Sequence, residues 1–300
     1  MSVDLATRPT AAQWLAGARP RTLPAAVSPV LVGSAVAVTV DGFSGLRALL
    51  ALVVSLALQV GVNYANDYSD GIRGTDANRV GPVRLVGSGL AQPQSVKRAA
   101  FGCFTVAAVA GLVLTALSGQ WWLLAVGAAC IAAAWYYTGG KKPYGYAGLG
   151  ELFVFVFFGL VAVCGTTLVQ VGRVPVAALL GGVGIGALAC ALLVANNLRD
   201  VEGDRLVGKR TLATRMGLAG TRAFYLALVL LALGAVLAMA AVTTWWVLLG
   251  LVGLAMIAPA MVTVLSGAHG PALIPVLKAT GMAELSYALG ILVGVLVGRF

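Results

Sequence analysis

Long apolar stretches alternate with short polar ones along the chain. Each stretch runs for about 17 to 25 residues with almost no charge, the length that an α-helix needs to cross a bilayer. Such stretches occupy residues 24–40, 46–66, 98–117, 120–138, 148–170, 174–198, 222–242, 244–265 and 279–298. Backbone groups that face lipid must be satisfied within their own segment, and the alternation of a membrane barrel is absent. The pattern predicts an all-α polytopic membrane protein with about nine transmembrane helices, forming a single domain over residues 1–300.

The composition agrees with a membrane protein. Hydrophobic residues make up 60% of the 300 residues and charged residues only 10%, whereas soluble domains are about a quarter charged. The net charge of +10 reflects basic loops in such a chain, so no nucleic-acid partner is predicted. The four cysteines lie in apolar stretches without CxxC spacing, which disfavours disulfides and a thiolate metal site.

The basic residues divide unevenly between the two sides of the predicted spans. Seventeen of the 20 lysines and arginines fall on the side of the N-terminus, and only Arg47, Arg173 and Arg299 fall on the other. Positively charged loops concentrate in the cytoplasm. We therefore expect a multi-pass protein of the cell membrane, with a cytoplasmic N-terminus and the C-terminus outside.

Six of the ten carboxylates gather in two short clusters on the predicted cytoplasmic side. The clusters consist of Asp67, Asp70 and Asp76, and of Asp200, Glu202 and Asp204. The sequences leading into them match, ANDYSD at 65–70 and ANNLRD at 195–200, which indicates an internal repeat. Because the copies lie four spans apart, they would have the same orientation and face each other across a central cavity.

Polar residues recur at helical spacing in both clusters. They are Asn63, Asn66, Asp67 and Asp70 in the first and Asn196, Asp200 and Asp204 in the second. Carboxylates at this density need a compensating cation, and the lack of His or Cys favours Mg²⁺. Magnesium is typically held by one or two carboxylates together with substrate phosphates, so a phosphorylated substrate is expected.

Nearby bases are candidates for binding a diphosphate, although orientation alone also demands cytoplasmic lysine and arginine. These candidates are Arg73, Lys141, Arg199, Lys209 and Arg210.

Five segments carry a resemblance to a known family. They are ARPRTLPAAVSP at 18–29, NDYSDGIRGTD at 66–76, YTGGKKPYGYAGLGE at 137–151, NNLRDVEGD at 196–204 and GKRTLATRMG at 208–217. Together they resemble the UbiA superfamily of intramembrane aromatic prenyltransferases, and within it the 1,4-dihydroxy-2-naphthoate polyprenyltransferases of menaquinone biosynthesis. In the wider superfamily a third Asp follows four residues after the second. Here that position is Gly74 and the acid comes at Asp76, which resembles the naphthoate branch.

The resemblance implies both a site and a reaction. It implies Mg²⁺ ligands at Asn66, Asp67, Asp70, Asp76, Asp200 and Asp204. Tyr137 and Lys141 match the YxxxK feature associated with the diphosphate, and with the four aspartates Asp67, Asp70, Asp200 and Asp204 they form the implied catalytic set. The implied reaction transfers a polyprenyl chain from an allylic polyprenyl diphosphate to 1,4-dihydroxy-2-naphthoate with decarboxylation, giving demethylmenaquinone.

The aromatic acceptor has candidate contacts of its own. Arg19 and Arg21 precede the first span and are able to hold a carboxylate through a fork-like contact, or simply to anchor the chain at the interface; Asn63 is assigned to the same substrate. Aromatic rings near the clusters would stabilise an allylic cation, or else face lipid. They are Tyr64, Tyr68, Trp135, Tyr136, Phe153, Phe155, Phe157 and Phe158. The small residues at 181–191 would form a wall beside an isoprenoid tail or allow close helix packing.

Three alternatives remain open at this point. Another aromatic acceptor such as 4-hydroxybenzoate would need the same diphosphate site. A transporter or magnesium channel also uses polar groups near the membrane, but here the acids gather at one face. A phosphotransferase for lipid alcohols would carry a contiguous DGxxAR-type motif, which the sequence lacks.

Overall fold

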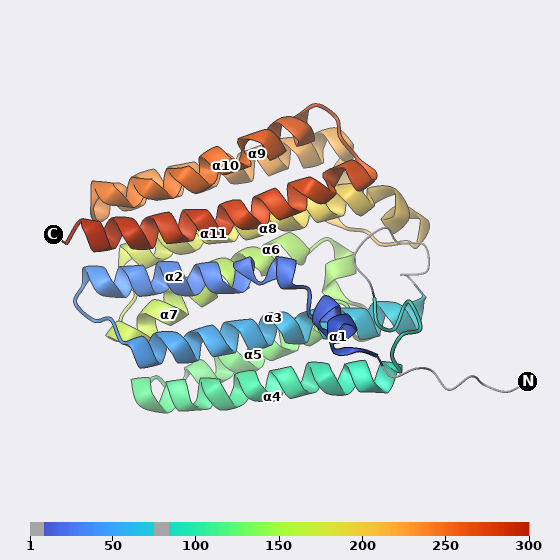
Figure 1. The fold of residues 1–300 in the computed structure, drawn as a ribbon, viewed down its shortest axis with the longest axis horizontal. Helices are drawn as coiled ribbons and strands as arrows, with labels where there is room; N and C mark the ends of the chain where they lie inside the picture. Colours follow the sequence, from blue (N-terminus) through green and yellow to red (C-terminus); the bar gives the residue numbers. More distant parts are fainter. Residues whose placement is uncertain (1–8, 75–83, 300) are drawn as a thin grey trace, which may run out of the picture.

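The computed structural model describes residues 9–74 and 84–299, and in those ranges helices are joined by short loops without a strand (Figure 1). Up to residue 136 the helices are α1 Ala11–Ala18, η1 Pro20–Thr22, α2 Pro24–Thr39, α3 Gly45–Arg73, α4 Pro93–Ser118 and α5 Leu123–Tyr136. After residue 136 they are η2 Tyr144–Ala147, α6 Gly150–Val154, the π-helical η3 Phe155–Val161, α7 Ala162–Val171, α8 Val176–Leu206, α9 Leu212–Val242, η4 Trp245–Gly250, α10 Leu251–Leu265, η5 Gly270–Leu273 and α11 Ile274–Val297. The all-α prediction is confirmed for this part of the chain.

Seven helical segments of the described chain are long and apolar enough to cross a membrane, and an eighth qualifies if the bent α1–α2 pair counts as one span. The helix α5 has 14 residues and extends about 21 Å at 1.5 Å per residue, less than a hydrocarbon core of about 30 Å. Each predicted stretch contains a helix. The count of nine spans nevertheless exceeds what these lengths support, and it stays a prediction.

The helices α3 and α8 extend beyond the stretches predicted for them. Helix α3 continues to Arg73 and ends where Gly74 takes a left-handed φ of 70°, and α8 continues to Leu206. The apolar pattern stops at 66 and 198 because polar residues follow. The helices continue because many of those residues, Asp67, Asp70 and Arg199 among them, are buried in the protein and never meet lipid.

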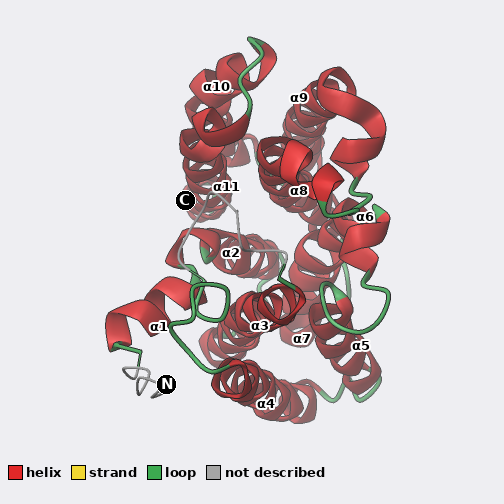
Figure 2. Ribbon diagram, turned by 90° about the vertical axis from the view of Figure 1, so that its right-hand side faces the viewer, coloured by secondary structure: helices red, strands yellow, loops and turns green. Residues whose placement is uncertain are grey.

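Helix α2 lies between two packed groups of helices. A large apolar cluster joins α2 to α8, α9, α10 and α11, and a smaller one joins α1, α3 and α4 (Figure 2). Glycines let the helices approach closely: a Cβ at Gly159 would lie 2.5 Å from the Gly182 carbonyl oxygen, and one at Gly184 would lie 2.3 Å from the Tyr287 hydroxyl. The small residues at 181–191 therefore serve mainly close helix packing.

The two acid-bearing helices run in the same direction. The C-terminal ends of α3 and α8 lie at the same end of the bundle as α1, and α11 ends at the opposite end (Figure 1). This is the parallel orientation that the repeated motif predicts.

Arg47 connects three helices at the end of the bundle away from the acids. Its guanidinium donates hydrogen bonds to the carbonyl oxygens of Leu117 at 2.6 Å, Val169 at 3.0 Å and Gln170 at 3.2 Å, where a cation also complements the helix dipoles of α4 and α7. We expect Arg47→Leu to lower the free energy of unfolding by about 1 to 3 kcal/mol. Thermal unfolding in detergent measures this, and an unaltered Tm would contradict it.

Candidate active site

One large cavity of about 1330 Å³ lies inside the helix bundle. It is lined by the turn between α1 and α2, by α3, α4 and α5, by the segment from η2 to α7, and by parts of α8 and α11. Its lining follows α3 from Ala51 to Asp70, over which the helix rises by about 28 Å. The cavity therefore extends through nearly the thickness of a hydrocarbon core of about 30 Å.

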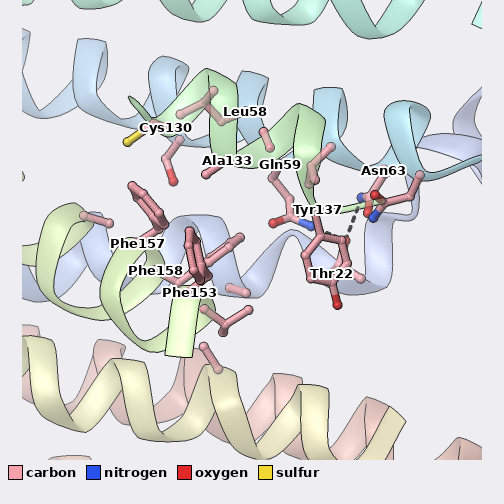
Figure 3. A pocket seen from close by; sticks show the side chains of 18 of the residues that line it. Thr22, Leu58, Gln59, Asn63, Cys130, Ala133, Tyr137, Phe153, Phe157 and Phe158 are labelled. Carbon is pink, nitrogen blue, oxygen red and sulfur yellow. Dashed lines mark hydrogen bonds between the residues drawn. The ribbon is translucent and has the colours of Figure 1, made fainter. Parts of the chain in front are cut away.

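The two ends of the cavity differ in chemistry. Its polar end, the polar mouth, is lined by Asn66, Asp70, Arg84, Arg199, Asp200, Asp204 and Lys209. Its other end, the apolar tunnel, is lined mainly by apolar residues of α3, α4, α5, η3 and α7, including Val54, Leu114, Leu123, Val161 and Val169. Three phenylalanines, Phe153, Phe157 and Phe158, stand between the two (Figure 3).

Both predicted acid clusters face this single cavity, and the first does so through Asn66 and Asp70 of α3. The Asn66 amide oxygen accepts a hydrogen bond from the Thr138 hydroxyl at 2.7 Å. Asp70 accepts a hydrogen bond from the Tyr146 hydroxyl, and its other oxygen lies 3.9 Å from Arg84 Nη2. The Asp70 carboxylate is thus held by a neutral donor and a cation.

The second cluster is held by its own cations. Arg199 binds both oxygens of Asp200, at 2.6 Å from Nε and 2.7 Å from Nη2, and Nη2 also donates to the Asn196 amide oxygen at 2.9 Å. Such two-point contacts fix the carboxylate firmly. Lys209 Nζ lies 3.8 Å from Asp204. Each acid that lines the cavity therefore has a basic partner near it.

Asp67 does not line the cavity with its neighbours. Its two carboxylate oxygens accept hydrogen bonds from the backbone N–H groups of Leu85 at 2.7 Å and Val86 at 3.0 Å, and only 1% of the residue is exposed. Asp67 therefore connects α3 to a loop segment. Each oxygen keeps a second lone pair, but a metal would have to reach a side chain that is almost wholly buried, and the predicted ligand role of Asp67 stays a prediction.

This difference in placement gives a testable contrast. We expect Asp67→Asn to lower the thermal stability, because an amide offers one acceptor oxygen and leaves a buried N–H without a partner at a cost of about 1 to 3 kcal/mol. The loss of activity should be smaller than that of Asp70→Asn. The activity predicted from the sequence and Tm, measured side by side for the two variants, check this. An equal loss of activity with an unchanged Tm for Asp67→Asn would favour the metal-ligand role.

The predicted diphosphate contacts divide into two groups. Tyr137, Arg199 and Lys209 line the cavity. Lys141 is exposed and outside the lining, and Arg210 lies in a separate basic cleft.

Arg73, the remaining base of this predicted set, is also outside the cavity lining. It donates hydrogen bonds to the carbonyl oxygens of Thr138 and Gly140 and so fastens the end of α3 to the loop before η2. The predicted metal ligand Asp76 lies outside the described residues.

Tyr146 is a site residue that the sequence reasoning missed. Its hydroxyl binds Asp70, and Lys209 Nζ and the Arg73 guanidinium lie 4.5 Å and 5.5 Å from its ring centroid. Its carbonyl oxygen accepts a hydrogen bond from the Arg210 N–H at 3.0 Å. Tyr146 thus joins the end of α3 to the segment after α8. It belongs to the YTGGKKPYGYAGLGE segment, but spacing alone did not distinguish it from the two other tyrosines there.

Tyr144, close to Tyr146 in the chain, stacks on Phe153 with ring centroids 4.1 Å apart and donates its hydroxyl to the Ala133 carbonyl oxygen at 2.8 Å. Burial raises the pKa of Tyr144 above its ordinary value of 10.0, so the hydroxyl stays a donor. It positions Phe153 on the cavity wall.

The residues predicted to contact the acceptor lie on one wall of the cavity. Arg19, Arg21 and Asn63 all line it, together with Lys278 of α11. Arg19 ends α1 in the left-handed conformation, with φ 54°, and this sharp turn directs the chain into η1 along the cavity. Lys278 is one of the 17 basic residues on the side of the N-terminus.

Comparison with known proteins decides the family. Residues 26–272 match the UbiA prenyltransferase family. A protein of Mycobacterium tuberculosis named 1,4-dihydroxy-2-naphthoate octaprenyltransferase is 55% identical over 280 residues, which cover 93% of this chain and 95% of the relative. The chain belongs to the UbiA prenyltransferase family. A protein of the same name from Escherichia coli is 40% identical over 223 residues, 72% of each chain.

Solved structures of UbiA homologues share the fold. The apo structure of a UbiA homologue from Aeropyrum pernix K1 matches with a TM-score of 0.67 and 16% identity, over 93% of this chain and 98% of that one. A UbiA homologue from Archaeoglobus fulgidus bound to GPP and Mg²⁺ matches with a TM-score of 0.59 and 12% identity, over 94% and 99%. The predicted resemblance to the superfamily is confirmed.

In this UbiA-family cavity the oxygen donors fit magnesium. Across residues 9–74 and 84–299, no three His, Cys, Asp or Glu side chains come together as a metal site. The donors stand instead in two groups, Asn66 with Asp70 on α3 and Asp200 with Asp204 on α8. Each group offers the one or two carboxylates that Mg²⁺ uses when substrate phosphates complete its coordination. The donor set therefore suits a metal bound together with a diphosphate.

Of the predicted aromatic residues, Phe153, Phe157 and Phe158 reach the cavity. Adjacent residues 157 and 158 both do so within the π-helical turn η3, a distortion that often occurs at functional sites. The others serve packing or face outward: the Tyr64 hydroxyl donates to the Trp14 carbonyl oxygen, Tyr68 stacks on Trp135, Phe155 contacts Gly186 and Tyr136 is exposed.

Proposed function

We propose that this UbiA-family enzyme transfers a polyprenyl chain from an allylic polyprenyl diphosphate to 1,4-dihydroxy-2-naphthoate. One observation carries the proposal: a single cavity joins a mouth lined by acids and bases to a long apolar tunnel. Both parts of a polyprenyl diphosphate thus find a matching environment. The names of the relatives from M. tuberculosis and E. coli supply the acceptor.

The diphosphate would lie at the polar mouth. Asn66, Asp70, Asp200 and Asp204 would hold Mg²⁺ there, with Asp67 and Asp76 as further proposed ligands, and the bound metal would neutralise charge on the leaving diphosphate. Arg84, Arg199, Lys209 and Tyr137 line the same mouth and would donate to phosphate oxygens as negative charge develops on them. Arg73, Lys141 and Arg210 remain proposed contacts from the surrounding loops.

The isoprenoid tail would lie in the apolar tunnel, because burying its surface is favourable there. Phe153, Phe157 and Phe158 stand where the allylic carbon would follow the diphosphate, and their ring faces would attract the developing cation. The apolar walls would exclude water that otherwise traps this cation as an alcohol.

The acceptor ring would approach from the wall formed by Arg19, Arg21, Asn63 and Lys278, whose cations would hold its carboxylate. The C–O bond of the allylic diphosphate breaks, a C–C bond to the ring forms, and the carboxylate leaves as carbon dioxide while the ring regains aromaticity. The product is the reduced form of demethylmenaquinone. The uneven distribution of basic residues supports a cytoplasmic mouth and an external C-terminus in the cell membrane.

The test is to incubate purified protein with a polyprenyl diphosphate, Mg²⁺ and either 1,4-dihydroxy-2-naphthoate or 4-hydroxybenzoate, while following prenylated product and carbon dioxide. We expect prenylation and carbon dioxide release with the naphthoate. Turnover of 4-hydroxybenzoate alone would overturn the assigned acceptor, and the absence of any prenylated aromatic product would overturn the enzymatic proposal.

A further inference from the structure

Gln59 stands on α3 where the polar mouth of the cavity meets the apolar tunnel. It lies two helical turns before Asn66, lines the cavity and is 7% exposed. A glutamine buried in an apolar helix face is costly unless both ends of its amide find partners. Because it stands alone in an apolar stretch and belongs to no motif, its sequence position gave no indication of a role.

The hydrogen bonds around Thr22 fix how the Gln59 amide is oriented. The Thr22 hydroxyl donates its single proton to the Arg19 carbonyl oxygen at 3.0 Å. Its two lone pairs then accept from Gln59 Nε2 and Asn63 Nδ2, each at 2.9 Å. Since a hydroxyl has only one proton to donate, Thr22 does not serve Gln59 Oε1 in this arrangement, and the amide turns its nitrogen toward Thr22.

The oxygen of the same amide lacks a hydrogen-bond partner among the described residues. Gln59 Oε1 is fully buried, and Figure 3 shows it turned away from Thr22 while the nitrogen faces that residue. A buried acceptor without a partner costs about 1 to 3 kcal/mol. A donor supplied by a ligand in the cavity would recover this cost.

The chemistry of the ligands limits which group that donor can be. The diphosphate and the carboxylate of the acceptor present only acceptor oxygens, and the isoprenoid tail presents only hydrocarbon. A magnesium ion among the acids would lie too far away, because the seven residues from Gln59 to Asn66 rise by about 10 Å. Among the proposed substrates, only a ring hydroxyl of the acceptor is able to donate to Gln59 Oε1.

We propose that Gln59 binds the aromatic acceptor by accepting a hydrogen bond from one of its ring hydroxyls. The inference rests on the proposed function and assigns this residue a part in recognising the acceptor. With the hydroxyl on Gln59 and the carboxylate near Arg19, Arg21 or Lys278 on the same wall, the ring would be held at two points beside the phenylalanines. This would set which ring carbon meets the allylic carbon.

The test compares the wild type with Gln59→Leu, which removes the acceptor oxygen together with the Nε2 donor to Thr22. We expect the KM for dihydroxynaphthoate to rise about tenfold, corresponding to one lost hydrogen bond, while the KM for the polyprenyl diphosphate changes by less than about twofold. Ser55→Ala is the matched control, since Ser55 lines the cavity one turn away but donates its hydroxyl to the Ala26 carbonyl oxygen. It should leave both KM values near those of the wild type. An equal rise in both KM values for Gln59→Leu would indicate a structural role and overturn the inference.

Acceptor analogues identify the hydroxyl. In 1-hydroxy-2-naphthoate and 4-hydroxy-2-naphthoate, used as substrates or competitive inhibitors, one hydroxyl is replaced by hydrogen. The analogue that lacks the hydroxyl bound by Gln59 should bind equally well to the wild type and to Gln59→Leu. The other analogue should bind to Gln59→Leu about tenfold more weakly than to the wild type. If both analogues bind to Gln59→Leu about tenfold more weakly than to the wild type, the inference is overturned, although the wild-type reaction still stands. A wild type that prenylates no aromatic acceptor would instead remove the proposed function on which the inference rests.

Discussion

Asp70→Asn and Asp200→Asn are each expected to lower prenyl transfer at least about 100-fold, because each removes a negative charge that would hold the cation on the leaving diphosphate. The amide keeps the size of the side chain and one acceptor oxygen, so Tyr146 at Asp70 and Arg199 at Asp200 retain a hydrogen-bond partner. The loss should therefore reflect charge more than packing.

The dependence on magnesium distinguishes a ligand from a structural carboxylate. If the two aspartates hold the metal, half-maximal activity should require more Mg²⁺ in the variants, and excess Mg²⁺ should recover part of the loss by mass action. Asp41→Asn is the control, since Asp41 is an exposed partner of Arg299 at the opposite end of the bundle. It should behave as the wild type. Near-normal turnover of either site variant at limiting Mg²⁺, with Tm unchanged, would contradict the ligand assignment.

Gly165→Phe is expected to discriminate between prenyl donors by tail length. Gly165 of α7 lines the apolar tunnel deeper than the three phenylalanines, and a Cβ there would meet nothing within 4 Å. A phenyl ring would extend into space that a long tail needs, and overfilling of this kind costs about 1 to 3 kcal/mol. The kcat/KM for a long polyprenyl diphosphate should fall about 10- to 100-fold, while that for geranyl diphosphate stays nearly constant because its short tail ends before this position.

The same substitution on the outer surface provides the control. Gly102 of α4 is exposed, has equally open space around it and does not line the cavity. Gly102→Phe should leave the preference for tail length unchanged. Equal losses with long and short donors for Gly165→Phe would place the tail outside this tunnel.

The position of the helices follows largely from the sequence, since a lipid environment permits few alternatives. Backbone hydrogen bonding forces each long apolar stretch into a helix, and every predicted stretch contains one. The helix bounds differ from the apolar stretches where lipid is not the neighbour. Helix α3 runs on through Asp67 and Asp70 because these residues are buried in protein.

The candidate site was found in part from the sequence. Asp70, Asp200 and Asp204 were predicted to face one cavity and do so, because helical spacing and an even number of intervening spans fix both their faces and their orientation. Spacing could not separate Asp67 from Asp70, although the former binds the backbone of Leu85 and Val86. That difference depends on which loop packs against which side of α3.

By itself, the sequence determined the membrane location, the helical class, the two acid motifs and the membership in the UbiA family, because each leaves a local and repeated pattern of residues. Only the tertiary structure decided which polar atoms meet. Tyr146 joins the two acid-bearing halves, and the single proton of Thr22 orients the amide of Gln59. Such pairings join residues far apart in the chain, so the spacing of residues in the sequence does not predict them. They arise when helices pack and their buried polar groups must find partners.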